Sequence, residues 1–335
     1  MIPAQQAASI AALTLFVATA AAQTQTHGQI VGEVGSDSAV VWTRASQPCL
    51  VSVLYDTNPT FATAVETPLY GAGAARDNTV RVLLTGLASD RLYYYRLRLR
   101  LQSSSPGNLG PIGRFRTAPL ASQSAPISFA FSGDVQTLSE YGIFTSVAAA
   151  NPAFFVMLGD FPYCDGAVTV SDYWLEHATH RASAAFQAFT NQVPVLAVWD
   201  DHEVVNNWDG ATSQMLVAAG TQAFRDWWPL PNGPTDIWRQ RRYGKELELF
   251  LIDTRRYRGR NDDPPSAQKP LLGATQLAWL EQALQQSDAT WKVIATSVPT
   301  FYNGTDSWDG YVHEREQLLA FLRQQHVDNV VFVAA

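Results

Sequence analysis

The feature that most constrains this sequence is an apolar segment, residues 193–199, that runs directly into Asp200-Asp201-His202-Glu203. A short apolar run of this kind is typical of a buried strand in an α/β sheet, and such sheets bind ligands just beyond the carboxyl ends of their strands. Adjacent carboxylates beside a histidine are costly there unless a cation or hydrogen bonds compensate them. The alternative is a solvated acidic turn, and this stretch alone would favour that alternative.

Two further apolar segments upstream end in the same way. Residues 127–131 lead to Asp134, and residues 153–158 lead to Asp160, each aspartate preceded by a glycine. One Gly-Asp turn after a strand is common. Three such ends in order, with helical spacing between them, instead bring their carboxylates to one edge of one sheet. The predicted metal-binding constellation consists of Asp134, Asp160, Tyr163, Asp201 and His202.

Oxygen atoms dominate the donors of this constellation. Hard oxygen ligands suit Fe³⁺, Ca²⁺, Mn²⁺ or Mg²⁺ better than ions that prefer thiolates. Asp160, at the end of the central strand, is the best candidate to bridge two ions, and the phenolate of Tyr163 favours Fe³⁺ as one of them. Because two ions can acidify water and hold the oxygens of a phosphoryl group, the pattern predicts metal-assisted hydrolysis of phosphate esters.

The succession of elements divides the chain into two parts. Residues 28–119 are short β-rich segments between turn signals, as in a β-sandwich. From residue 127 onward strands alternate with helices, one of them expected over residues 172–190, which predicts an α/β domain. We expect a small β-sandwich domain of the fibronectin or immunoglobulin type over residues 23–120 and the α/β domain over residues 121–335.

The first 22 residues are expected to be a secretory signal peptide. Residues 7–22 are uncharged, apolar or small, and end in three alanines, which suits cleavage by signal peptidase. The apolar stretch is shorter than the roughly 20 residues that a membrane-spanning helix needs, so no stable membrane span is expected. An uncleaved anchor is the alternative. We therefore expect an exported protein that is periplasmic, secreted or held at the cell surface.

Charge and cysteine content exclude other classes. The net charge of −7 speaks against a general binder of nucleic acids or anionic membranes, but leaves room for a local cationic pocket. Cys49 and Cys164 are too few for a disulfide-built scaffold, and whether they pair is left open. The expected partners are small phosphoester substrates, and the sequence leaves the oligomeric state open.

Three motifs carry a resemblance to a known family. They are DDHE at residues 200–203, DTRRYR at residues 253–258 and VVWTR at residues 40–44. With the two Gly-Asp turns, the chain resembles the alkaline phosphatase D (PhoD-like) branch of the calcineurin-like metallophosphoesterases. The resemblance implies a layered αββα sandwich that is incomplete at the C-terminus. Family members continue past the last strand into a turn with another metal-binding histidine, whereas this sequence stops at Ala335.

The same resemblance implies a metal site and the residues that form it. One ion, ferric, would be held by Asp134, Asp160 and Tyr163, and the second, Ca²⁺ with Mn²⁺ or Mg²⁺ as alternatives, by Asp160 and Asp201 with help from Asn206 or Asn207. Many family members have cysteine where Asp134 stands, which is a departure at the iron site.

The reaction implied is hydrolysis of phosphate monoesters, diesters or both by a metal-activated hydroxide. His202 would lie beside the scissile phosphate with Asp201 and donate a proton or hydrogen bond, or else be a structural histidine bonded to an aspartate. Arg255 would orient the substrate or tie its strand end to the following loop. The alternatives for the whole chain are a catalytically impaired fragment and a cell-surface binding module.

Overall fold

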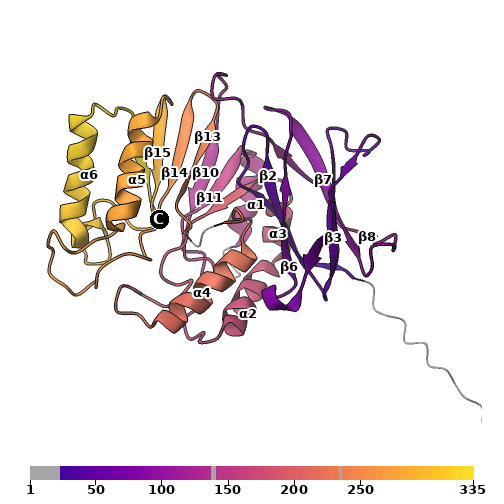
Figure 1. Cartoon of the computed structure of the whole chain (residues 1–335), viewed down its shortest axis with the longest axis horizontal. Helices are drawn as coiled ribbons and strands as arrows, with labels where there is room; N and C mark the ends of the chain where they lie inside the picture. The colour runs from indigo at the N-terminus through magenta and orange to yellow at the C-terminus, as the bar shows by residue number, and fades with distance from the viewer. Residues whose placement is uncertain (1–22, 137–140, 234–235) are drawn as a thin grey trace, which may run out of the picture.

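The computed structural model describes residues 23–136, 141–233 and 236–335. The expected signal peptide, residues 1–22, therefore lies outside the described residues. A β-rich part comes first and packs beside an α/β part that contains two sheets and their helices (Figure 1). Within the described ranges, no helix has the length and apolar character needed to cross a membrane.

The N-terminal part is built from two antiparallel sheets. The first has the order β1-β2-β6 and consists of Gln25–Gly32, Ala39–Ala45 and Thr79–Leu84. The second consists of β3 (Cys49–Asp56), β4 (Val65–Glu66), β5 (Tyr70–Ala72), β7 (Leu92–Arg100), β8 (Asn108–Leu109) and β9 (Gly113–Arg116). Every second residue of β7 is buried, so one face of this strand packs against the first sheet and the other is wet.

The α/β part contains two further sheets. One is wholly parallel and consists of β10 (Phe129–Ser132), β11 (Phe154–Met157) and β12 (Val195–Ala197). The other consists of β13 (Arg239–Tyr243), β14 (Leu247–Leu251), β15 (Trp291–Ala295) and β16 (Val330–Val333). Only the β13–β14 pair of this second sheet is antiparallel.

These two sheets form the middle of a four-layer arrangement. The apolar core between them includes Val156 and Leu196 from one sheet and Leu249 and Val293 from the other. The outer face of the first sheet is covered by α1 (Gly142–Ala150), α2 (Val170–Arg181), α3 (Ala184–Thr190) and α4 (Gln214–Trp227). The outer face of the second sheet is covered by α5 (Gly273–Gln286) and α6 (Val312–Gln324) (Figure 1). The expected α/β class with a preceding β-rich domain is confirmed.

One expected helix is wrong in detail, and two elements were not expected. Residues 172–190 form two helices, α2 and α3, because the chain breaks at Ala182 and Ser183, whose hydroxyl accepts from the backbone of Phe186 and begins the second helix. No secondary structure was predicted for the segments that form helix α4 and the arginine-rich strand β13.

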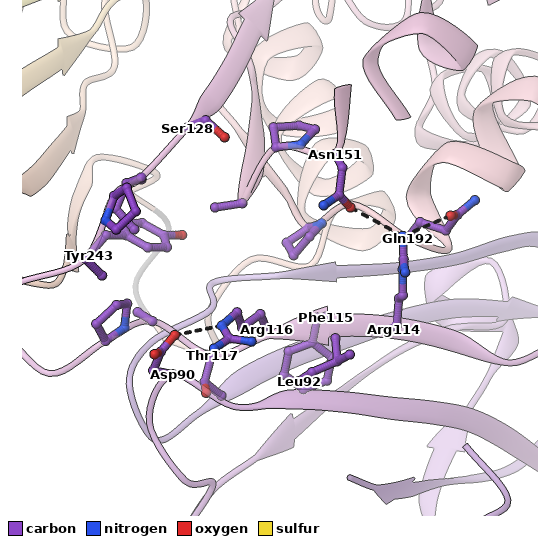
Figure 2. Close-up of a pocket in the computed structure, with 18 residues that line it drawn as sticks. Asp90, Leu92, Arg114, Phe115, Arg116, Thr117, Ser128, Asn151, Gln192 and Tyr243 are labelled. Atoms are coloured by element: carbon purple, nitrogen blue, oxygen red, sulfur yellow. Dashed lines mark hydrogen bonds and ion pairs between the residues drawn. The ribbon is translucent and has the colours of Figure 1, made fainter. Parts of the chain in front are cut away.

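The two parts of the chain meet along an interface with direct polar contacts. The Trp42 indole donates to the backbone carbonyl of Asp226 at 2.7 Å, deep in the contact. Farther along the interface a cavity of about 360 Å³ separates the parts. Figure 2 shows Arg116 paired there with Asp90 of the turn before β7, while Arg114 reaches across to Asn151 at 3.3 Å.

A glycine sets how closely the two parts approach. A Cβ on Gly32, at the end of β1, would lie 2.5 Å from Pro229 Cγ and 2.6 Å from the Val195 carbonyl oxygen. Gly32→Ala must therefore push β1 away from β12, and we expect it to lower the free energy of unfolding by about 1–3 kcal/mol. Gly71→Ala is the matched control, because a Cβ there meets nothing within 4 Å. Urea titration would measure both, and equal stability of the two variants would contradict this close contact.

Candidate metal centre

Side chains able to bind a metal gather at the carboxyl ends of β10, β11 and β12. The parallel pairing of the strands aligns their ends, so the loops that follow them begin side by side. One ligand atom each from Asp160, Asp201 and His202 lies within 4.8 Å of the other two. The structure thus brings three of the sequence-predicted residues to a single point.

Tyr163 and Asp134 lie beside this group. The Tyr163 hydroxyl donates to Asp160 Oδ2 at 2.9 Å, and its ring lies against the ring of His202 with centroids 4.1 Å apart. The Asp134 carboxyl is exposed, and its pKa is raised by burial while the neighbouring Asp160 side chain acts to lower it. Asp160 contacts neighbours from two different loops and lies at the middle of the constellation.

The backbone of the loops explains the residues chosen at two positions. Asp134 and Asp160 have φ angles of 57° and 56°, in the left-handed region that aspartate tolerates better than most residues. Gly159 has a φ of 110°, and a Cβ on it would lie 2.5 Å from Asp200 Cβ. A glycine is therefore required for the loops after β11 and β12 to touch.

Buried Glu203 joins these two loops. Its carboxylate accepts hydrogen bonds from the backbone N–H groups of Asp160 at 3.2 Å, Phe161 at 3.1 Å and Asp200 at 2.9 Å. Sequence reasoning quoted this residue as part of a motif but gave it no role. Its adjacency to His202 was the only available signal, because two of its three hydrogen-bond partners, Asp160 and Phe161, lie about forty positions upstream.

Negative charge accumulates in the site beyond what the described residues neutralise. Burial, followed by the charges of Glu203, Asp200 and Asp201, raises the pKa of Asp160 to about 10. Burial also raises the pKa of Asp201, and that of Glu203 to about 8. A cation would reverse these shifts by favouring the ionised carboxylates. The donor set of buried carboxylate, phenol and imidazole therefore fits a hard metal ion.

Asp200 points away from this centre, toward the second sheet. Arg255 donates to its two oxygens at 2.8 and 2.9 Å, and the Ser297 hydroxyl donates at 2.6 Å. Burial alone would raise the pKa of Asp200, but the Arg255 guanidinium lowers it to about 2. Arg255 is fully buried, and its Nη2 lies 3.5 Å from Asp201 Oδ1. Its contacts are those of a residue that ties a strand end to a loop.

His202 is oriented by a carboxylate that the sequence did not single out. Its Nδ1 is bonded to Asp165, which also accepts the backbone N–H of Asn206 at 2.8 Å. Asp165-Gly166 looks like an ordinary turn in the sequence, which is why it carried no expectation. The structural alternative for His202 was a hydrogen bond to an aspartate, and Nδ1 makes such a bond with Asp165. The other ring nitrogen, Nε2, remains available for chemistry.

The two asparagines predicted to assist the second ion lie at the rim. Asn206 and Asn207 are both exposed. The backbone N–H of Asn207 donates to Asp201 Oδ2 at 2.5 Å, so this loop fixes the orientation of the Asp201 carboxylate. The contacts place Asn207 beside Asp201 and Asn206 beside Asp165.

Two further histidines and four tryptophans belong to the core. His177 and His180 are buried, and each is hydrogen-bonded through Nδ1, to Arg181 and Tyr141 respectively. The buried tryptophans are Trp208, Trp227, Trp228 and Trp308. Both cysteines are buried free thiols. The cavity of Figure 2 lies among the residues that precede β10, β11 and β12, at the opposite edge of the sheet from the metal centre.

Comparison with known proteins gives consistent matches along the chain. The family profile of "PhoD-like phosphatase" matches residues 129–335, and that of "PhoD-like phosphatase, N-terminal domain" matches residues 8–119. Alkaline phosphatase D of Bacillus subtilis (strain 168) is 30% identical over an alignment that covers 91% of this chain and 63% of that protein. The chain thus spans less than two thirds of that relative. A solved structure described as "Structure of PhoD" has a TM-score of 0.84 at 28% identity, covering 92% of this chain and 70% of that one.

The raised pKa of Glu203 predicts how stability depends on pH without metal. An unfolded glutamate loses its proton near the ordinary pKa of 4.5, whereas folded Glu203 keeps it up to about 8. Between these values the folded state binds more protons, so its free energy of unfolding falls as pH rises, by at most about 1.4 kcal/mol per pH unit. We expect the thermal unfolding midpoint, measured in excess chelator, to decrease as the pH is raised from about 5 to about 8.

Glu203→Gln provides the comparison for this prediction. The variant cannot ionise there, so its midpoint should fall less steeply over the same range, from a lower starting value because an amide group replaces one acceptor oxygen. Scanning calorimetry at a series of pH values measures both slopes. A wild-type midpoint that is constant or rises over this range would contradict the assignment.

Proposed function

Because the chain belongs to the PhoD-like phosphatase family, we propose that it hydrolyses phosphate monoesters, phosphodiesters or both in a metal-dependent reaction. The observation that carries the proposal is the convergence of Asp160, Asp201 and His202 within 4.8 Å. Burial and the neighbouring carboxylates raise the pKa of Asp160, which means that ionised Asp160 is unfavourable there without a cation.

The ions would be held by the residues at the ends of the three parallel strands. Asp134, Asp160 and Tyr163 would bind Fe³⁺, and Asp160 with Asp201, assisted by Asn206 or Asn207, would bind Ca²⁺, with Mn²⁺ or Mg²⁺ as alternatives. When bound, such ions supply positive charge that acidifies water and neutralises phosphate oxygens. The hydrogen bond that joins Tyr163 to Asp160, and the position of Asp134 beside Asp160, support the first group.

His202 would act directly on the substrate. Asp165 holds Nδ1, and the Tyr163 ring lies against the imidazole, so the ring is restrained from two directions. Nε2 would donate a proton or hydrogen bond to a phosphoryl oxygen or to the leaving group. Asp165 would be a positioning residue that keeps the imidazole in the required tautomer.

Arg255 would act through Asp200 and Asp201 rather than on substrate. Its side chain is fully buried, and its donors are directed at carboxylates. It would keep the loop after β12 in place and lower the repulsion felt by Asp201. We extend the proposal to an exported protein with its domain boundary near residue 120, supported by the apolar leader in the sequence and by the change from all-β to α/β structure.

Metal content and chelation test the proposed function. We expect iron and a second divalent ion by elemental analysis of the purified protein, and hydrolysis of p-nitrophenyl phosphate, bis-p-nitrophenyl phosphate or both that is lost in chelator and recovered on adding the metals. Asp160→Asn should lose both metals together, because it removes the shared ligand. Full activity in metal-stripped protein would refute the metal dependence, and full metal content without hydrolysis of either ester would refute the reaction.

Replacing His202 tests its role separately from metal binding. His202→Gln should lower kcat/KM by about 10²–10⁴-fold, because a positioned proton donor is lost. His313→Gln on α6, where the side chain is exposed, is the matched control and should leave kcat/KM unchanged. Iron content should persist in both variants. An unchanged rate in His202→Gln would leave His202 with only a structural role.

A further inference from the structure

A second cavity lies where the N-terminal part meets α4, and its walls are rich in arginine. It has a volume of about 540 Å³ and is lined by residues from both parts of the chain. The charged residues of its lining are Arg76, Arg81, Arg225, Asp226 and Arg256. Four guanidinium groups therefore face one space together with a single carboxylate, in a chain whose net charge is −7.

One arginine of the lining, Arg81, donates only to an uncharged partner in the hydrogen bonds described, the Leu230 carbonyl at 3.3 Å. Arg225 donates to the Pro231 carbonyl at 3.3 Å among its contacts. Backbone carbonyls fix the orientation of a guanidinium but do not cancel its charge. The lining carboxylate, Asp226, also accepts from the Trp174 indole at 3.2 Å, so part of its capacity is directed elsewhere.

Arg256 closes another side of this cavity. The nearest carboxylate to its Nε is Asp236 at 3.9 Å, which also accepts from the Tyr257 hydroxyl. Its Nη1 is buried and has no hydrogen-bond partner among the described residues. A buried donor without an acceptor is costly and is usually satisfied by water, an ion or a ligand.

The positive charges around this cavity repel one another. The pKa of Arg81 is lowered to about 10 by burial and then by the charges of Arg225 and Arg76, while Asp226 acts in the opposite direction. The pKa of Arg225 is likewise lowered by burial, and the charge of Arg256 contributes. An anion in the cavity would relieve this repulsion, whereas a neutral ligand would not.

We propose that this arginine cavity, formed by Arg76, Arg81, Arg225 and Arg256, is an anion site that binds a phosphate group. Guanidinium groups present several N–H donors in a fixed plane and match the oxygens of a tetrahedral oxyanion. The cavity shares no lining residue with the metal centre, and Arg256 directly follows Arg255, which holds Asp200. Its occupant is either free phosphate or a second phosphate group of an extended substrate.

Titration calorimetry with inorganic phosphate on the metal-loaded protein tests this site. Arg81→Gln and the exposed Arg76→Gln should each weaken the arginine-site dissociation constant at least tenfold. Arg98→Gln, which removes a guanidinium paired with Glu66 on the other sheet of the β-rich part, is the control and should leave it unchanged. Because Arg76 is exposed and takes part in no interior packing, this variant keeps the test valid if Arg81→Gln folds poorly.

Asp160→Asn separates this site from the metal centre. Phosphate binding that persists in Asp160→Asn but is weakened in the two arginine variants supports the arginine site, whatever becomes of the proposed hydrolysis. Binding lost in Asp160→Asn and unchanged in Arg76→Gln and Arg81→Gln would overturn it.

Steady-state kinetics then distinguish the two sources of the phosphate group. If Arg81→Gln raises KM for glucose 1,6-bisphosphate and not for p-nitrophenyl phosphate, the site holds a second phosphate of the substrate. If KM for both is unchanged while phosphate binding is weakened, the site holds free phosphate.

Discussion

Burial of negative charge at the ends of β10, β11 and β12 is the constraint on which the rest of the site depends. Each carboxylate is compensated differently. Asp200 is held by the Arg255 guanidinium, and Glu203 is held by three backbone N–H groups. Asp160 and Asp201 have no such set of backbone donors, and burial raises the pKa of both, as it does that of Glu203. The arrangement therefore fixes the loops by interactions within the protein and leaves to a cation the carboxylates nearest His202.

Much of the architecture could be predicted from the sequence because its signals are local. The strands that end at Asp134, Asp160 and Asp201 are short apolar runs, and parallel strands bring their carboxyl ends to one edge. Two elements lacked such a signal. Helix α4 contains Gly220, which lowers helix propensity but is required because a Cβ there would lie 2.8 Å from Val204 Cγ2. The sequence of strand β13, RQRRY, lacks the apolar residues that indicate a buried strand. It can still form a strand because it lies at the edge of its sheet, where polar side chains are tolerated.

Predicting the supporting residues required knowledge of contacts across the fold. Glu203 and Asp165 stand next to predicted residues, yet their roles depend on partners about forty positions away. Arg255 shows the same limit from the other side. The sequence left open whether it orients substrate or ties a strand to its loop. Its complete burial against Asp200 favours the second role, and only contacts across the fold supply that information. Residues that would touch a ligand can be recognised in a sequence by their side-chain chemistry. Residues that support them can be recognised only from their contacts in the folded protein.

The arginines of this chain separate into two groups by the same reasoning. Arg255 and Arg258 are fully buried, and both are paired with Asp306. Their charges are cancelled inside the protein, which is what a structural role requires. Arg81 is only partly buried, lines the arginine cavity and donates to a backbone carbonyl that carries no charge. Grouping several arginines around one cavity carries a cost in repulsion, which Asp226 opposes. An anion in the cavity would offset more of that cost, which is the reason for proposing a ligand there, whereas the contacts of Arg255 and Arg258 are with carboxylates of the protein itself.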